Sequence, residues 1–292
     1  MGATTACIAG EEVYRQWQAG SIRGTSLGSR QTPFGPSGDL FLVEGEGQPF
    51  YLLPRYGVGM GKTAPSRINY RANIYALKDM GTRCILAWGS GGAITHSFAV
   101  GDIVILNDLI DQTRLRIGTF FENSPLGFLR QFPVFCPSMR RVVAEVLHDM
   151  KLVYHGTGTA AVTEGPRLET PAEVRWLTSI GAEVVTHTFV PEVFLARELQ
   201  MCYIGVCYVV NYAETGSRQP PFIGGGLFAA LDPNAGNNRL AGVLGSITQI
   251  ASNVADALEK TDANCECART LAHYTKEYNL GDDWRTWFDK VQ

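Results

Sequence analysis

The sequence has no strong excess of charge of either sign. Among 292 residues, 25 are lysine or arginine and 28 are aspartate or glutamate, so the net charge is −3 and the pI is near 6.0. Nucleic acids and anionic membranes are normally bound through a basic stripe, and we expect neither as a partner. The chain also has no apolar run of membrane-spanning length and no basic N-terminal segment followed by an apolar one. We therefore expect a cytoplasmic protein.

The cysteines do not form the pattern of a disulfide framework. Their number, seven, is odd, and Cys84, Cys202 and Cys207 lie in apolar runs typical of strands, which favours buried free thiols. Cys265 and Cys267 are separated by one residue, but no second pair of ligands with zinc-site spacing follows in the sequence. We predict no metal and no cofactor.

Short apolar runs alternate with amphipathic segments along most of the chain, which is typical of α/β proteins. At 45% hydrophobic residues the chain can bury one large core. We expect one domain over residues 1–260 and a C-terminal helical extension over 261–292. The extension carries Trp284, Trp287 and Phe288, aromatic residues suited to docking on the body or on a neighbouring subunit.

Several local elements can be predicted from the residues. Residues 39–44 and 50–54 flank a glycine turn and predict a hairpin, and Ser66 can cap a helix over about 67–80. A strand at 83–88 is expected to break at the glycine-rich residues 89–92. Further strands are expected at 102–109, 158–163, 183–187 and 202–210, and helices at 138–150, 171–180 and 191–200. Residues 215–238, rich in glycine and proline, are interpreted as a lid or as a surface loop.

Three long motifs stand in consistent order. They are PSRINYRANIYALK at 65–78, EGPRLETPAE at 164–173 and VPEVFLARE at 190–198. These motifs resemble the trimeric purine nucleoside phosphorylase and methylthioadenosine phosphorylase family, and the resemblance runs from about Gln31 to about Thr215. It implies a mixed central sheet flanked by helices, phosphate as co-substrate, and assembly as a homotrimer or a dimer of trimers.

The resemblance also implies how phosphate would be bound. Arg55, at a predicted strand end, and Thr188 match phosphate ligands of the family. Ser90 could add its hydroxyl, and the adjacent glycines could present backbone N–H groups as an anion nest.

Three positions near this site depart from the family pattern. Tyr56 replaces a histidine, Gly89 replaces a threonine before Ser90, and Glu11 stands where the first loop usually has a hydroxyl residue. A carboxylate facing phosphate is repulsive in a partly dry cleft. Either Glu11 points elsewhere and phosphate still binds, or the pocket holds water and Glu11 is the general base of a hydrolase.

At the sugar, His187 replaces a methionine of the family and could bind a ribose hydroxyl. Met60 and Phe128 resemble the apolar edge near the 5′ position, with Phe128 reaching in from an adjacent subunit. This edge favours a 5′-deoxy or alkylthio substituent.

At the base, the adenine-specific branch carries two aspartates where this sequence has Asn211 and Ala213. An amide can donate to a 6-carbonyl and accept from a ring N–H, so Asn211 suits a 6-oxopurine, as in the methylthioinosine phosphorylase branch. Glu169 could accept from N1–H, and Leu168 could form an apolar wall.

Three functional interpretations remain open from the sequence. The first is a nucleoside phosphorylase acting on a 6-oxopurine, 5′-modified nucleoside. The second is a nucleoside hydrolase or another ribosyl-cleaving enzyme on the same fold. The third is an inactive nucleoside-binding protein, since a fold alone does not guarantee activity.

Overall fold

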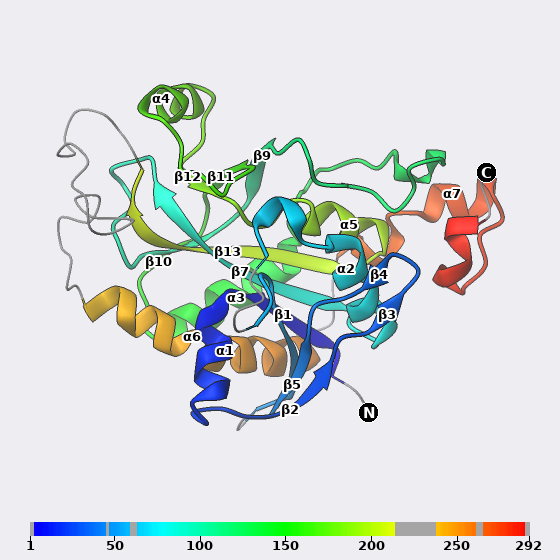
Figure 1. Ribbon diagram of the computed structural model, residues 1–292, viewed down its shortest axis with the longest axis horizontal. Coiled ribbons are helices and arrows are strands. Elements are labelled where there is room, and N and C mark those ends of the chain that lie inside the picture. Colours follow the sequence, from blue (N-terminus) through cyan, green and yellow to red (C-terminus); the bar gives the residue numbers. More distant parts are fainter. Residues whose placement is uncertain (1–2, 45–46, 59–62, 214–237, 261–264, 290–292) are drawn as a thin grey trace.

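A large mixed β-sheet forms the centre of the protein (Figure 1). The computed structural model describes residues 3–44, 47–58, 63–213, 238–260 and 265–289. The main path of the sheet has the strand order β10-β8-β13-β7-β1-β6-β5-β2, and β12, β11 and β9 continue from β7 as a branch. The strands are β1 (Thr5–Ala9), β2 (Arg23–Gly28), β5 (Leu40–Glu44), β6 (Phe50–Pro54), β7 (Cys84–Ala93), β8 (Ile103–Ile105), β9 (Asp108–Gln112), β10 (Tyr154–His155), β11 (Thr159–Thr163), β12 (Val184–Thr186) and β13 (Cys202–Tyr212), with a small separate pair, β3 (Gln31–Thr32) and β4 (Gly35–Pro36).

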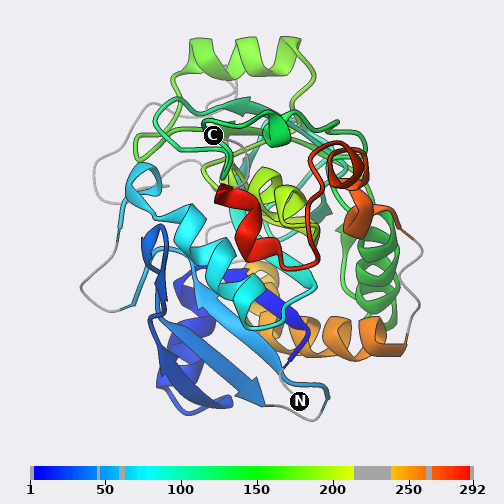
Figure 2. The same ribbon diagram turned by 90° about the vertical axis from the view of Figure 1, so that its right-hand side faces the viewer.

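Helices cover both faces of the sheet, as the sequence predicted for an α/β protein (Figures 1 and 2). On one face α6 contacts both α1 and α3, and on the other α2 contacts α5. Helix α4 lies apart, beside β11 and β12, over a small apolar cluster of its own. The helices are α1 (Glu11–Gln18), α2 (Tyr70–Asp79), α3 (Pro137–Asp149), α4 (Pro171–Ser179), α5 (Glu192–Glu198), α6 (Asn238–Lys260) and α7 (Ala272–Glu277), with 3₁₀ turns at Pro65–Arg67, Pro125–Gly127, Cys267–Arg269 and Trp284–Asp289.

The predicted hairpin is confirmed, since β5 and β6 pair antiparallel with Phe41 opposite Leu52. The predicted cap of the following helix was wrong. Residues 65–67 form a 3₁₀ turn, and the helix begins later, where the Asn69 side chain accepts a hydrogen bond from the Ala72 N–H. An asparagine caps a helix as well as a serine does, so residue type alone could not choose between them.

The predicted break at residues 89–92 was also wrong, because β7 continues to Ala93. These residues pair with β13, and residues 92–93 also pair with β12. Glycine is needed here for close packing: a Cβ on Gly89 would lie 2.3 Å from the Thr188 Oγ1, and one on Gly91 would lie 2.6 Å from the Cys207 Sγ. The expected anion nest is therefore absent at these four residues.

The predicted single strand over 102–109 is two strands, β8 and β9.

The C-terminal residues pack against the body. Leu271, Leu280 and Trp287 are buried in the main core cluster. The Trp284 ring lies 4.8 Å from the Tyr75 ring, and Arg285 pairs with Asp79 on α2. Among the described helices, none combines the length and the apolar character that crossing a membrane requires.

Candidate active site

A cavity of about 100 Å³ lies where β7, β12 and β13 end beside the loop after β11. Eight of the residues predicted from the sequence contribute to its wall. They are Tyr56, Ser90, Leu168, Glu169, His187, Thr188, Asn211 and Ala213. The motifs are far apart in the chain, and the strand order brings them to one edge of the sheet, where α/β proteins bind ligands.

Asn211 reaches the cavity through an irregularity in β13. The pairing of β13 with β7 shifts between Val209 and Asn211, which places Asn211 opposite Gly92. Bulges of this kind re-aim side chains beside active sites. The Asn211 side chain is buried, and its Nδ2 donates to the Tyr212 carbonyl at 2.8 Å.

Glu169 and His187 are joined by the hydroxyl of Thr163. Thr163 Oγ1 donates to Glu169 Oε1 at 2.5 Å and lies 2.9 Å from His187 Nδ1. Burial lowers the pKa of His187 against the opposing effect of Glu169, so the ring is neutral at pH 7. Because the single hydroxyl proton of Thr163 goes to Glu169, Nδ1–H must donate to Thr163, which leaves Nε2 as an acceptor. An acceptor there suits a sugar hydroxyl.

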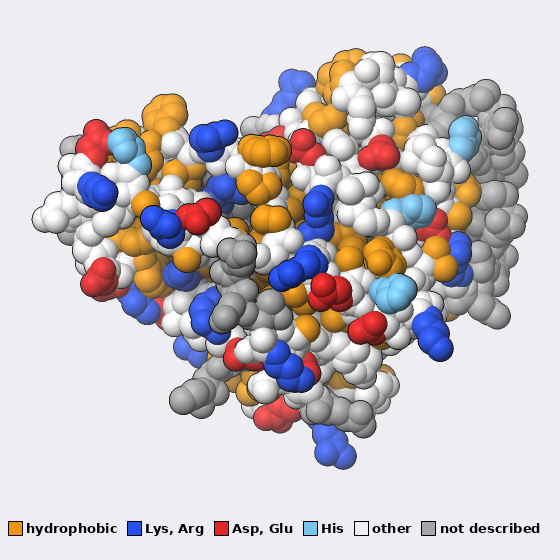
Figure 3. Space-filling view, turned by 180° about the vertical axis from the view of Figure 1, so that it is seen from behind, with side chains coloured by type: hydrophobic (Ala, Val, Ile, Leu, Met, Phe, Trp, Pro, Cys, Tyr) orange, Lys and Arg blue, Asp and Glu red, His pale blue; other side chains and the backbone are white. Residues whose placement is uncertain are grey.

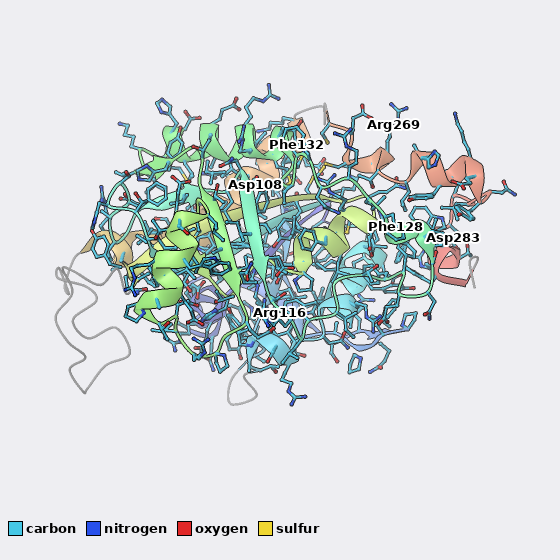
Figure 4. The ribbon with its side chains drawn as sticks, turned by 90° about the horizontal axis from the view of Figure 1, so that it is seen from above. Asp108, Arg116, Phe128, Phe132, Arg269 and Asp283 are labelled. Carbon is cyan, nitrogen blue, oxygen red and sulfur yellow. The ribbon has the colours of Figure 1, made fainter. Side chains whose placement is uncertain are left out.

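Arg116 holds this side of the site together, and sequence reasoning missed it. Its side chain is completely buried and pairs with Glu164 at 3.1 Å. It also donates to four backbone carbonyls, those of Thr163, Glu164, His187 and Val190. Figure 4 shows Arg116 beyond the end of β9, on the chain that leaves that strand. Nothing in its local sequence separates it from Arg114, which is why the pattern did not reveal it.

Arg55, predicted as a phosphate ligand, lies behind the cavity in a buried ion pair. Its Nε and Nη2 donate to the carboxylate of Glu192 at 2.6 and 3.0 Å, and Nη1 donates to the Trp88 carbonyl at 2.8 Å. The Tyr203 hydroxyl also donates to Glu192. With a further contact of 3.5 Å from Nη2 to the Ile8 carbonyl, the bonds of Arg55 engage four of the five N–H groups of its guanidinium.

The two N-terminal glutamates point in different directions. The Glu11 Oε2 accepts from Arg15 one turn along α1, at 2.8 Å, and Glu11 does not line the cavity. Glu12 Oε1 instead accepts from the Gly10 N–H at 3.1 Å, and the Glu12 carboxylate lies near the Tyr208 hydroxyl, whose pKa is raised mainly by burial and further by that carboxylate. Adjacent helical residues project about 100° apart, so Glu12 is directed toward Gly10 and Tyr208, although it does not line the cavity either. The sequence showed two consecutive glutamates but not where each of them points.

The remaining predicted residues lie elsewhere. The Tyr56 side chain lines the cavity, and burial raises its pKa, so at neutral pH it stays a hydrogen-bond donor. Met60 and residues 215–237 of the expected lid lie outside the described residues. Phe128 is 82% exposed and does not line the cavity of its own chain, and Figure 4 shows it away from Arg116.

A second cavity of about 440 Å³ meets the first at Glu169. Its wall contains both apolar and charged side chains, among them Leu115, Glu164, Arg167 and Trp176. The first cavity has the Glu169 carboxylate, the Asn211 amide, the neutral His187 imidazole and several hydroxyls beside apolar side chains. That donor set fits a heterocycle joined to a sugar.

The fold and the cavity define a class of α/β enzyme that binds small ligands at strand ends. The chain belongs to the phosphorylase superfamily, whose sequence pattern matches residues 30–231, and the resemblance predicted from the motifs is confirmed. It is 38% identical over 215 residues to a probable 6-oxopurine nucleoside phosphorylase of Thermococcus kodakarensis, covering 71% of this chain and 79% of that protein. It is 37% identical over 208 residues to a probable S-methyl-5′-thioinosine phosphorylase of Methanothermobacter thermautotrophicus, covering 71% of each.

The fold has close relatives among solved structures. A methylthioadenosine phosphorylase from an antarctic soil metagenomic library superimposes with a TM-score of 0.80 at 24% identity, covering 93% of this chain and 92% of that one. The predicted nucleoside-phosphorylase-like fold with a mixed central sheet is thereby confirmed.

Proposed function

We propose that this protein is a pentosyltransferase that cleaves the N-glycosidic bond of a 6-oxopurine nucleoside with phosphate. The observation that carries the proposal is that Glu169 and Asn211, from different strand-end segments, line one cavity together with Leu168. The carboxylate accepts from N1–H of the base, and the amide bonds to the 6-carbonyl and N7 edge. Neither group selects for adenine, and the two relatives named for 6-oxopurine and thioinosine substrates support this choice.

The transition state explains why the site contains recognition groups instead of a protein nucleophile. As the glycosidic bond breaks, the sugar gains oxocarbenium character and the base gains negative charge. Asn211 stabilises the departing base by hydrogen bonding, while a phosphate oxygen attacks C1′ and forms the sugar 1-phosphate. Phosphate is a co-substrate here, and the proposed reaction uses no cofactor.

We place phosphate against Ser90, Thr188 and Tyr56, whose side chains line one side of the cavity. Ser90 and Tyr56 can each donate a hydroxyl hydrogen bond to a phosphate oxygen. Thr186 Oγ1 donates to the Ser90 carbonyl, so the Thr188 hydroxyl donates to Thr186 and would exchange that bond for one to phosphate. Arg55 does not line the cavity but adds positive charge near it. Arg55 would contact phosphate directly only if its side chain shifted away from Glu192. The ribose hydroxyls lie toward His187 Nε2.

A hydrolase is the second candidate, favoured by one observation. The Glu12 carboxylate accepts from the Gly10 N–H, a backbone group that could otherwise bind an anion. In this alternative the site holds water in place of phosphate, and Glu12 is the general base. The role that sequence reasoning gave to Glu11 then passes to its neighbour.

The assay that tests the proposal is base release from inosine, methylthioinosine and methylthioadenosine with and without phosphate, with the sugar product identified by mass. We expect sugar 1-phosphate that forms only with phosphate, with the two 6-oxopurine substrates preferred. Free sugar formed equally well without phosphate would establish the hydrolase. Nucleoside binding without turnover would leave only the binding-protein interpretation.

Exchange of each N-terminal glutamate separates the roles of the two carboxylates. Two unit charges about 5 Å apart at an effective dielectric constant near 20 repel by about 3 kcal/mol. Glu12→Thr is therefore expected to lower the KM for phosphate at least tenfold in a phosphorylase, whereas it abolishes turnover if Glu12 is a hydrolytic base. Glu11→Thr is the matched variant on the same helical turn. Loss of activity there, with Glu12→Thr unaffected, would return the role to Glu11.

We also propose that the protein assembles as a homotrimer, or as a dimer of trimers, with Phe128 and Met60 forming the apolar 5′ edge across an interface. Four of the seven large apolar side chains that are exposed among the described residues lie between Leu115 and Phe132, at exposures up to 82%. Exposed apolar groups gathered in one segment favour burial by a partner. We further propose that residues 1–260 form the catalytic domain and that residues 261–292 form an appendage to it. We also propose that the protein is cytoplasmic, because that compartment keeps thiols reduced.

Light scattering coupled to size exclusion tests the assembly. Three copies of a 31.9 kDa chain give about 96 kDa. Phe128→Ser with Phe132→Ser is expected to reduce this mass and to raise the KM for nucleoside, whereas Ile180→Ser, at another exposed apolar position, changes neither. A wild-type monomer with full activity would contradict the interface.

On the face of the protein shown in Figure 3, basic and acidic side chains are interspersed. We therefore propose that the protein has no nucleic-acid partner.

A further inference from the structure

Four cysteines from three separate segments converge at one point. The sulfur atoms of Cys136, Cys202, Cys265 and Cys267 all lie within 4.8 Å of one another. The Cys202 and Cys265 sulfurs are 3.5 Å apart. Four thiolates around a tetrahedral Zn²⁺ at about 2.3 Å are separated from each other by roughly 3.8 Å, so the cluster has the dimensions of a zinc site.

The surrounding backbone holds the ligands in place. Cys136 stands just before Pro137 at the start of α3, and its N–H donates to the Tyr203 carbonyl at 2.9 Å. Cys202 is the first residue of β13. Cys265 and Cys267 lie at the 3₁₀ turn that opens the C-terminal extension, where the Thr270 hydroxyl donates to the Arg197 carbonyl at 2.9 Å. The second pair of ligands that the sequence lacked near Cys265 and Cys267 is thus supplied by the body of the protein.

The charge of such a site would also be compensated. Four thiolates and one Zn²⁺ carry a net charge of −2, which is costly next to a buried region without a cation. Arg197 lines the same small cavity as Cys136 and Cys267. Its Nη1 donates to the Arg130 carbonyl and its Nη2 to the Pro133 and Val134 carbonyls, whereas its Nε is buried with no hydrogen-bond partner. A guanidinium with an uncommitted N–H beside the sulfurs suits a thiolate cluster.

We propose that Cys136, Cys202, Cys265 and Cys267 bind one structural Zn²⁺ that fastens residues 265–289 to the body of the protein. Four cysteine ligands close the coordination sphere and leave no position for substrate. The site is also remote from the cavity, since Cys202 and Asn211 are nine residues apart on one strand, or roughly 30 Å at about 3.3 Å per residue. The zinc therefore serves the fold and takes no part in the chemistry. This inference does not depend on the proposed function.

The first test is elemental analysis of protein purified without chelators. We expect one zinc per chain and its loss from the Cys265→Ser/Cys267→Ser double variant. Cys84→Ser is the matched control, because Cys84 lies opposite Cys202 in the neighbouring strand but is not one of the four ligands. It should keep the full zinc content. Zinc retained by the double variant, or lost from the control, would overturn the ligand assignment.

A thiol count on the wild-type protein keeps the test independent of whether variants fold. Denaturation in a chelator without reductant should release one zinc and expose all seven thiols of the chain. Protein without metal that shows only three free thiols would mean that the four cysteines form two disulfides, and the proposal would fail. Removal of zinc from folded protein is expected to open residues 265–289 to proteolysis while the kcat of the remaining intact protein is unchanged.

Discussion

Replacing Asn211 with alanine is expected to lower kcat/KM for inosine by roughly 100- to 1,000-fold, the usual loss when one donor to a developing negative charge is removed. The amide is buried at the bulge of β13, so no water molecule easily takes its place. The effect should fall mainly on kcat, because the hydrogen bond strengthens as the base departs.

A matched control for this variant is Asn73→Ala. Asn73 is as deeply buried as Asn211, but its Oδ1 accepts from the Gly38 N–H outside the cavity. We expect that variant to unfold at a lower temperature with kcat/KM nearly unchanged. An Asn211→Ala enzyme that keeps more than half of its kcat/KM would remove Asn211 from the proposed mechanism.

Asn211→Asp gives a complementary result. A carboxylate can accept from a 6-amino group but cannot donate to a 6-carbonyl. The variant is therefore expected to lose activity toward inosine and to gain activity toward adenosine-type substrates relative to the wild type. A change of equal size for both bases would argue against contact between residue 211 and the 6-position.

Replacing Glu192 with alanine is expected to destabilise the fold by about 3–5 kcal/mol, the cost of leaving one charge of a buried pair without its partner. Glu192 and Arg55 are almost fully buried, and their side chains form two hydrogen bonds with each other. For a chain of this size the loss corresponds to a fall in Tm of about 5 to 15 °C, measured by calorimetry.

The double variant Arg55→Met/Glu192→Leu tests whether the unpaired charge of Arg55 causes the loss of stability. With both charges gone the desolvation cost is also gone, and much of the stability should return. Asp79→Asn, which breaks the exposed pair with Arg285, should cost less than about 1 kcal/mol. If Glu192→Ala unfolds at the wild-type temperature, the pair is not the buried structural contact that the geometry indicates. Phosphate that raises the Tm of Glu192→Ala more than that of the wild type would show that the freed Arg55 can bind the anion.

The sequence by itself determined the family, the order of the elements and most of the cavity wall. Long motifs such as residues 164–173 made these features predictable. In such a motif the end of a strand, the ligand-binding residue and the cap of the next helix are neighbours in the sequence. The capping box at Thr170 and Glu173 is an example, since the two residues satisfy each other across three positions. The glycines of β7 were visible too, although their role was misread, because only the contact with Thr188 and Cys207 explains why a side chain does not fit.

The tertiary structure decided the features that depend on groups far apart in the chain. It turned Glu12 toward the Gly10 N–H and Glu11 toward Arg15, and it paired Arg55 with Glu192 across 137 positions. It placed Arg116 under four carbonyls of the loops around the site, and it brought Cys136 and Cys202 to Cys265 and Cys267. A local sequence pattern predicts which face of its strand or helix a residue lies on. It does not predict which distant segment packs against that face. Ion pairs, metal sites and close contacts depend on that distant segment, so only the tertiary structure shows them.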